Sequence, residues 1–121
     1  MQSLNTCETE VYIADSLAAD LETLIKPYLD EKIFVLTDSH TRRLCFPLIE
    51  NIPGISSERC IEIGAGDEFK NTETLISVWK CLVEGGANRH SLLINLGGGM
   101  PCDLGGFAAA TFKRGIDFIN I

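Results

Sequence analysis

The chain has 121 residues, of which 45% are apolar and 22% are charged. This length is typical of one domain, because domains cluster at roughly 100–150 residues, and it excludes a complete large two-domain enzyme. Ten Lys and Arg stand against seventeen Asp and Glu, and the net charge of −7 disfavours nucleic acid and an anionic membrane surface as partners. No run of about 18 apolar residues is long enough for a membrane span.

Cysteine usage and the first residues indicate a reducing cytoplasm. The five cysteines are an odd number, and they form no CxxC pair and have no nearby histidine at zinc spacing. Cys60 and Cys81 have apolar neighbours, which is typical of thiols that pack as small hydrophobic groups. Residues 1–10, which include Cys7, carry acids and lack the apolar segment of a secretory signal.

In the first half of the chain, strand-like and helix-like segments alternate. Residues 11–13 predict a short strand, and Asp15 is placed to cap the helix that follows. Residues 32–37 are apolar on both faces, as in a parallel strand that helices cover, and a short helix with Leu44 and Phe46 is expected next. The first helix has its apolar positions on one face, at Leu17, Leu21, Leu24, Ile25 and Tyr28.

The second half continues the alternation. Residues 59–63, 91–96 and 116–121 are strand-like, and a helix with Pro101 at its first position is expected between the last two. Another helix, capped by Asn71 or Thr72 and closed by a glycine pair at 85–86, has an apolar face made of Leu75, Ile76, Trp79, Leu82 and Val83. The order predicts an α/β fold, a Rossmann-like parallel sheet with helices on both faces.

A glycine loop between a buried strand and a helix is the sharpest local feature. It reads Gly97-Gly98-Gly99-Met100-Pro101-Cys102-Asp103. Glycines let the backbone approach a phosphate, and the first N–H groups of a helix then bind the anion. Ligands of open parallel sheets also bind outside the carboxyl ends of the strands. The loop is neither GxGxxG nor a P-loop, so a plain tight turn stays open as an alternative.

Two other strand ends carry polar side chains that are expected at the same sheet edge. Asp38 and His40 follow the second strand, and Asp67 and Lys70 follow the third. Three convergent loops favour a nucleotide-sized site.

Several of these polar residues, and Arg114, which could meet a phosphate, also have a plain structural explanation. Asp38 fits a helix cap, His40 a loop, and Arg114 an exposed turn. Asp103 near the third helical position is stabilised by the helix dipole alone. No nucleophile–base pair or metal-ligand spacing is present, so we predict no catalytic and no metal-binding residue in this chain.

The run from Asn95 to Gly115 resembles the 3-dehydroquinate synthases. It contains the triple glycine, then Asp-Leu-Gly-Gly-Phe-Ala-Ala-Ala and finally Arg-Gly. The resemblance covers the whole chain and is weakest before residue 32. It implies that NAD is contacted by Asp38, His40, Asp67 and Lys70, that its pyrophosphate and adjoining ribose are lined by Gly98, Gly99, Met100 and Asp103, and that Arg114 contacts the substrate, at its phosphate and across a dimer interface.

Three positions depart from the family pattern. His40 stands where the family often has Asn, Asp67 where it has Glu, and Pro101 where it has a small aliphatic residue. His40 can still form hydrogen bonds, whereas Asp67 is shorter by one methylene. Pro101 removes one N–H donor from the loop.

The resemblance also implies an activity. The family are carbon–oxygen lyases that convert 3-deoxy-D-arabino-heptulosonate 7-phosphate, a phosphorylated sugar acid, to 3-dehydroquinate and phosphate in the shikimate pathway of aromatic amino acid biosynthesis. Bound NAD transiently oxidises a substrate hydroxyl, and a divalent metal (zinc or cobalt) polarises the substrate in the full-length enzyme. We expect residues 1–121 to be the NAD-binding domain of a cytoplasmic homodimer. The helical metal-binding domain is absent from this chain, and the chain alone is expected to be inactive.

Three alternatives remain open. One is another sugar-phosphate cyclase, because the residues that discriminate between substrates lie beyond Ile121. Another is the N-domain of an iron-dependent alcohol or glycerol dehydrogenase, whose members generally lack the Asp-Leu-Gly-Gly-Phe-Ala-Ala-Ala run. The third is a stand-alone nucleotide-binding module.

Overall fold

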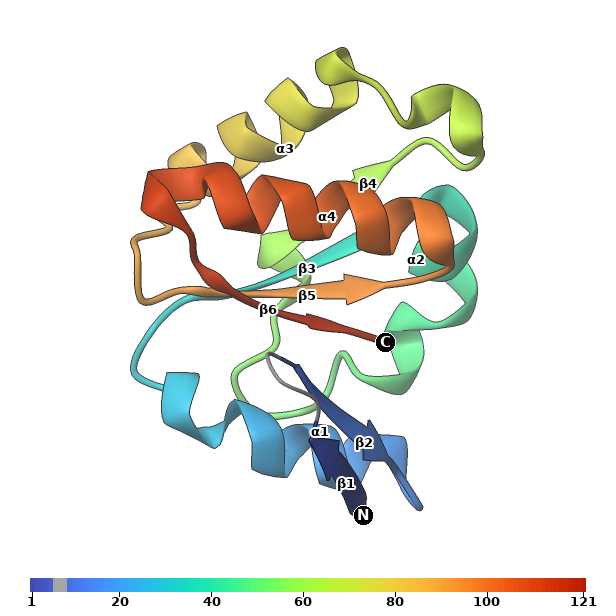
Figure 1. Ribbon diagram of the computed structural model, residues 1–121, viewed down its shortest axis with the longest axis vertical. Helices are drawn as coiled ribbons and strands as arrows, with labels where there is room; N and C mark the ends of the chain where they lie inside the picture. The colour runs from blue at the N-terminus through green and yellow to red at the C-terminus, as the bar shows by residue number, and fades with distance from the viewer. Residues whose placement is uncertain (6–8) are drawn as a thin grey trace.

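A four-stranded parallel sheet forms the centre of the molecule in the computed structural model, which describes residues 1–5 and 9–121 (Figure 1). The strand order is β4-β3-β5-β6, and β3 pairs with both β4 and β5. The strands are β3 (Ile33–Asp38), β4 (Cys60–Ile63), β5 (Leu92–Leu96) and β6 (Asp117–Asn120). Each lies within a residue or two of its predicted range, so the predicted α/β sheet is confirmed. Cys7 lies outside the described residues.

Helices cover both faces of this sheet. On one face, α3 (Thr72–Glu84) and α4 (Gly99–Thr111) pack on Phe34, Leu36 and Leu93. On the other face, α1 (Leu17–Ile25) and the segment around Phe46 pack on a second set of apolar side chains. The central strands β3 and β5 are buried on both faces, as their mostly apolar sequences predict.

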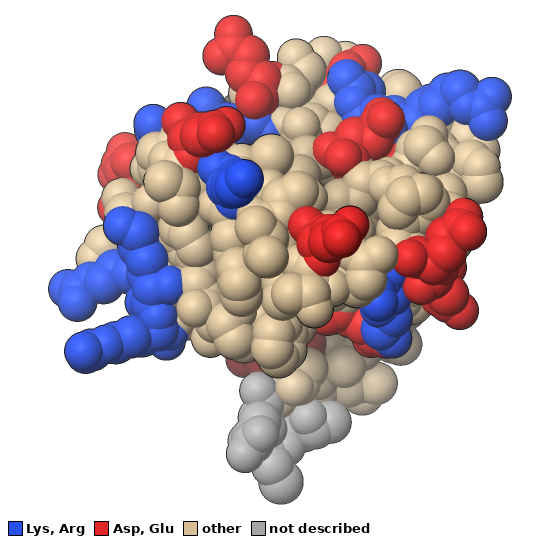
Figure 2. Space-filling view, turned by 90° about the horizontal axis from the view of Figure 1, so that it is seen from above, with Lys and Arg blue, Asp and Glu red and all other residues tan. Residues whose placement is uncertain are grey.

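Figure 2 shows the α3–α4 face from outside. Asp and Glu side chains are spread over it, and a group of Lys and Arg side chains gathers at its left edge. The charge on this face is therefore mixed.

None of the helices in the described part of the chain is long and apolar enough to cross a membrane.

A small hairpin precedes the sheet. β1 (Gln2–Asn5) and β2 (Glu10–Ile13) pair antiparallel and lie beside α1 (Figure 1). The sequence predicts β2 but not β1, whose four residues are mostly polar. The hairpin forms its own sheet, and its apolar side chains Leu4, Val11 and Ile13 are 45–56% exposed.

Two helix predictions need correction. Ser16, not Asp15, occupies the N-cap position of α1, and no side chain caps the helix. The Asp15 backbone N–H donates to Asp20 Oδ2. Asn71 caps α3 as predicted, and Gly86 has the left-handed φ of +79° after the helix. However, Ile76 and Val83 of the predicted apolar face are 42% and 62% exposed. The inward positions follow the i, i+3, i+4, i+7 rule and are Leu75, Val78, Trp79 and Leu82.

The start of α4 also differs from the prediction. The helix begins at Gly99, so Pro101 is its third residue and Asp103 its fifth. Proline is tolerated there because the first N–H groups of a helix have no partner inside it.

The helix after β3 is split into α2 (Ser39–Leu44) and a 3₁₀ turn at Phe46–Leu48. Phe46 is buried in that turn, whereas Leu44 is 62% exposed.

Candidate functional site

The strand order creates a switch point between β3 and β5. These strands are neighbours in the sheet, but the chain leaves β3 along one face and leaves β5, through α4, along the other. Such a reversal opens a crevice outside the carboxyl ends of the two strands, where open α/β sheets bind their ligands. The two turns that border it contain Asp38 and the glycine loop.

On the β5 side of the switch point, the glycine loop presents backbone N–H groups that no side chain covers. Gly98 stands at the N-cap of α4, where no side chain caps the helix. A Cβ atom built on Gly98 or Gly99 would meet nothing within 4 Å, so packing inside the protein does not require glycine at either position. The first N–H groups of a helix lack intrahelical partners, and at Gly99 and Met100 they carry the positive end of the helix dipole.

Asp38 lies on the β3 side of the switch point, at the N-cap of α2. Its Oδ1 accepts hydrogen bonds at 2.8 Å from the backbone N–H groups of His40 and Thr41, and the Thr41 hydroxyl accepts one from the Asp38 N–H at 3.0 Å. This capping box fixes the start of α2. The turn also touches the glycine loop, because a Cβ on Gly97 would lie 3.4 Å from the Thr41 methyl group. Among the described residues Asp38 Oδ2 accepts no hydrogen bond, so this oxygen stays available.

The loop after β4 reaches the same site through one ion pair. Lys70 Nζ lies 2.9 Å from Asp103 Oδ2, and both side chains are about half exposed. The hydrogen bond to Asp103 raises the pKa of the Lys70 ammonium group. The ion pair therefore holds the Lys70 ammonium group next to the first turns of α4.

The other predicted site residues differ in exposure and in distance from the glycine loop. His40 and Asp67 are exposed, at the second residue of α2 and the first of a 3₁₀ turn. The Met100 side chain is buried in the core, so only its backbone can face a ligand. Arg114 follows the far end of α4, about 20 Å from the glycine loop for a helix of this length. The structure thus brings the other predicted residues to one edge and leaves Arg114 at the opposite one.

Two local features were not anticipated. Lys113 and Arg114 have φ values of +45° and +69°, which is uncommon for residues other than glycine. In the sequence only the two basic residues and Gly115 mark this turn, and neither signal specifies a left-handed backbone at Lys113 and Arg114. The second feature is Asn95, which is fully buried in β5 and visible in the sequence only as a break in an apolar run.

The described residues form no metal-ligand cluster, and their cysteines are packed or exposed side chains. Nowhere in the described residues do three His, Cys, Asp or Glu side chains gather as metal ligands would. Cys102, in the first turns of α4, donates weakly to the carbonyl of Gly97, and burial raises the pKa of its thiol. Cys81, expected among apolar neighbours, is exposed.

The sequence profile of the 3-dehydroquinate synthase N-terminal family matches residues 60–121, just over half of the chain. The chain belongs to this family. A 3-dehydroquinate synthase of Parabacteroides distasonis is 45% identical over 114 residues, which are 94% of this chain and 32% of the relative. The 3-dehydroquinate synthase of Shewanella sp. (strain MR-4) is 35% identical over 92% of the chain and 31% of its own length.

Solved structures share the fold. A crystal structure of 2-deoxy-scyllo-inosose synthase matches 99% of this chain and 35% of its own, with a TM-score of 0.84 and 18% identity. ValA, the 2-epi-5-epi-valiolone synthase of Streptomyces hygroscopicus subsp. jinggangensis 5008, was solved with NAD⁺ and Zn²⁺ and matches with a TM-score of 0.77 and 20% identity. The chain spans about a third of the length of these relatives and structures.

Proposed function

We propose that this chain is the NAD-binding part of a 3-dehydroquinate synthase. The observation that carries the proposal is the β3–β5 switch point, with the uncapped amino end of α4 on one side and Asp38 on the other. The family membership supports NAD as the occupant over other nucleotides. It also favours the synthase over a dehydrogenase N-domain or a stand-alone module. The cyclases with the same fold keep another sugar-phosphate substrate as the second candidate.

The residues present fit the cofactor. Nothing lies within 4 Å of a Cβ built on Gly98 or Gly99, so no protein atom keeps a pyrophosphate from the backbone there. The pyrophosphate would accept hydrogen bonds from the N–H groups of Gly99 and Met100. Asp38 Oδ2 is free to accept from a ribose hydroxyl. Lys70 would add a positive charge next to the phosphates while Asp103 orients it.

The remaining roles complete the proposal. His40 and Asp67 would border the nucleotide, and Arg114 would contact the substrate phosphate across the interface of a homodimer. NAD supplies the hydride acceptor of the reaction, and this chain binds and orients it. A divalent metal, zinc or cobalt, would be held elsewhere in the whole enzyme, because the described residues offer no ligand cluster. The whole enzyme would act in the cytoplasm on a phosphorylated sugar acid.

Binding of NAD and of ADP-ribose to the 121-residue chain tests the cofactor proposal. We expect ¹⁵N chemical-shift changes in residues 38–41, 66–70 and 97–103 during titration. Gly99→Ala should weaken binding about tenfold or more, because its Cβ would project into the space for the phosphates. Lys70→Ala should also weaken it, whereas Lys80→Ala, the same charge removal on α3, should not. A folded chain with no shifts at millimolar NAD, or with shifts elsewhere, would contradict the proposal.

The second part of the proposal concerns activity. We expect the chain alone to show no synthase turnover in an assay with added zinc, because the chain spans about a third of its curated relatives. Clear turnover would refute this part and leave the NAD site untouched.

A further inference from the structure

Thr41, in the first turn of α2, is bound to Asp38 by three hydrogen bonds. Its hydroxyl accepts from the Asp38 N–H at 3.0 Å and donates to the Asp38 carbonyl at 3.4 Å. Its backbone N–H donates to Asp38 Oδ1 at 2.8 Å. This one residue therefore engages the N–H, the C=O and one carboxylate oxygen of Asp38.

These contacts decide which oxygen of Asp38 can meet a ligand. Oδ1 accepts from the backbone N–H groups of both His40 and Thr41, which uses both acceptor positions of that oxygen. Because the backbone and Oδ1 are held, the short Asp38 side chain has little freedom to rotate. Oδ2, which no donor among the described residues reaches, is therefore kept in one direction.

The Thr41 side chain also contacts the glycine loop. A Cβ built on Gly97 would lie 3.4 Å from the Thr41 Cγ2 and 3.0 Å from the Pro101 Cγ. Thr41 thus lies between the carboxylate that is expected to bind a ribose and the loop that is expected to bind the pyrophosphate. Valine has the shape of threonine with a methyl group in place of the hydroxyl. Thr41→Val therefore removes the hydroxyl hydrogen bonds and keeps the contact with the loop.

We propose that Thr41 is a positioning residue for nucleotide recognition, whose hydroxyl holds Asp38 so that Oδ2 accepts a hydrogen bond from a ribose hydroxyl. This role rests on the proposed function, since it concerns the same NAD site. An acceptor that is already oriented gains more from the hydrogen bond, because less conformational freedom is lost on binding. The capping box alone would stabilise α2 whatever the ligand is. A test must therefore separate ribose recognition from helix stability.

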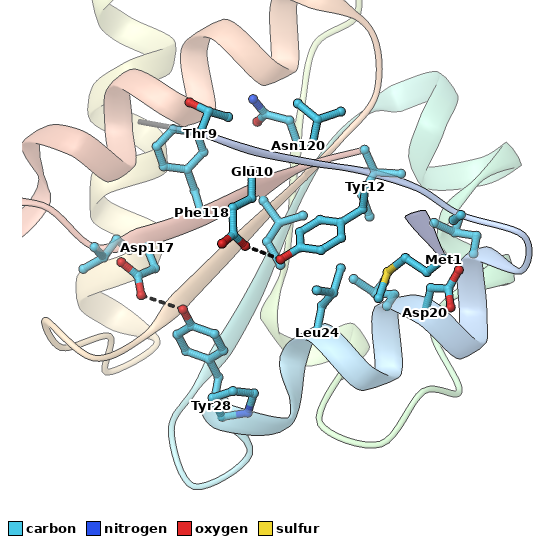
Figure 3. Close-up of a pocket in the computed structure, with 18 residues that line it drawn as sticks. Met1, Thr9, Glu10, Tyr12, Asp20, Leu24, Tyr28, Asp117, Phe118 and Asn120 are labelled. Carbon is cyan, nitrogen blue, oxygen red and sulfur yellow. Dashed lines mark hydrogen bonds between the residues drawn. The ribbon is translucent and has the colours of Figure 1, made fainter. Parts of the chain in front are cut away.

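The groove beside the hairpin does not offer a competing nucleotide site. Its volume is about 860 Å³, and β2, α1 and the segment 116–121 line it (Figure 3). Its charged side chains are Glu10, Asp20 and Asp117, and no Lys or Arg of the described residues lines it. Carboxylates without a cation repel a pyrophosphate, so nucleotide binding is expected at the switch point and not here.

Binding of ADP and of 2′,3′-dideoxy-ADP to the 121-residue chain, measured by isothermal titration, tests the proposal. The two ligands share the base and the phosphates, so the ratio of their Kd values reports on the ribose hydroxyls. Partial unfolding of a variant weakens both ligands by the same factor and leaves the ratio unchanged. We expect the wild type to bind ADP about tenfold more tightly or better. Thr41→Val should lower this ratio about threefold or more, whereas Thr41→Ser, which keeps the hydroxyl, should retain it.

Two further variants provide the controls. Asp38→Ser keeps an oxygen at the N-cap but removes Oδ2, and should bring the ratio close to one. Thr23→Val removes a hydroxyl that donates to a carbonyl within α1, and should leave the ratio at its wild-type value. Inorganic pyrophosphate should bind equally to the wild type and to Thr41→Val, because the contact with Gly97 is kept.

The outcomes separate this role from the proposed function. A wild-type ratio in Thr41→Val, or equal weakening of ADP, dideoxy-ADP and pyrophosphate, would overturn the role of Thr41 and leave the NAD site standing. A wild-type ratio in Asp38→Ser would overturn it as well, because Oδ2 would then not contact the ribose. Absence of ADP and pyrophosphate binding by the folded wild-type chain would contradict the proposed function, and the role of Thr41 with it.

Discussion

At the scale of single residues, Asn95 and Gly105 set how closely α4 lies on β5. Asn95 is fully buried, and its Nδ2 donates to Asn120 Oδ1 at 2.9 Å. Its Oδ1 is a buried oxygen without a hydrogen-bond partner among the described residues. A Cβ on Gly105 would lie 1.9 Å from that oxygen. The helix can therefore approach the strand this closely only because residue 105 has no side chain.

This contact predicts a coupled pair of mutations. Gly105→Ala should lower the free energy of unfolding by about 1–3 kcal/mol, because the methyl group overpacks the interface. Adding Asn95→Ala should recover part of the loss, because it removes the amide that the methyl group meets. Urea unfolding of the single and double variants measures both effects.

Gly99→Ala serves as the control for this pair. It adds the same methyl group to the same helix, where nothing lies within 4 Å, and should change the free energy of unfolding by about 0.5 kcal/mol or less. If Gly105→Ala costs the same with Asn95 or Ala at position 95, the Asn95 amide is not the source of the strain.

Tyr28 predicts a loss of stability at high pH. Partial burial, together with the hydrogen bond to Asp117, raises its pKa from 10.0 to about 12. The folded state thus favours the neutral phenol, so this contribution is complete below pH 10 and is lost as the pH rises toward 12. Thermal unfolding of the wild type and of Tyr28→Phe over this range should show a steeper decline for the wild type. Parallel curves would exclude the effect.

The sequence allowed prediction of residues whose role depends on local chemistry. Asn71 caps α3, where a short polar side chain precedes an apolar helical pattern. Asp38 caps α2 because its short carboxylate directly follows a strand and reaches the N–H groups of His40 and Thr41. Asn95 could not be predicted, because its role depends on a glycine ten positions away that only the fold brings against it. The convergence of Lys70 with Asp103 could be expected only as a shared sheet edge, since spacing does not specify an ion pair.

At the scale of the elements, the turn after α4 stores backbone strain. Lys113 has φ +45° and ψ +44°, the left-handed region that favours glycine. Lys113→Gly should raise the free energy of unfolding by about 1 kcal/mol, as measured by urea unfolding.

Lys80 provides the opposite control for this substitution. It lies in the interior of α3, where Lys80→Gly should lower the free energy of unfolding by about 1 kcal/mol. Changes of the same sign at both positions would show that the left-handed conformation does not govern the effect.

Elements with one clear periodicity could be predicted from the sequence, and those with a weak pattern could not. The strands β3 and β5 are mostly apolar on both faces, so the sequence predicts their type and position directly. β1 has one apolar residue in four, Leu4, and its pairing with β2 is visible only in the structure. The sequence predicts a start of α4 at Pro101, two residues later than the actual start at Gly99. Proline is common at the first helical position, and it is also tolerated two residues further on.

At the scale of the whole molecule, the two sheets should differ in local stability. β5 is central and buried along its full length, whereas the hairpin is exposed and lies outside the main sheet. Amide hydrogen exchange should therefore be slowest in β3 and β5, intermediate in β6 and fastest in β1 and β2. Hairpin amides that exchange as slowly as those of β5 would show instead that both sheets unfold as one unit.

The position of β5 in the chain has a consequence for folding during synthesis. β3 is complete at residue 38, but its second neighbour begins only at residue 92. While residues 39–92 are being synthesised, the apolar strand Ile33–Asp38 lacks its β5 neighbour and the cover of α4. Nascent chains therefore present an aggregation-prone strand during this interval, which is when a chaperone would have the most apolar surface to bind.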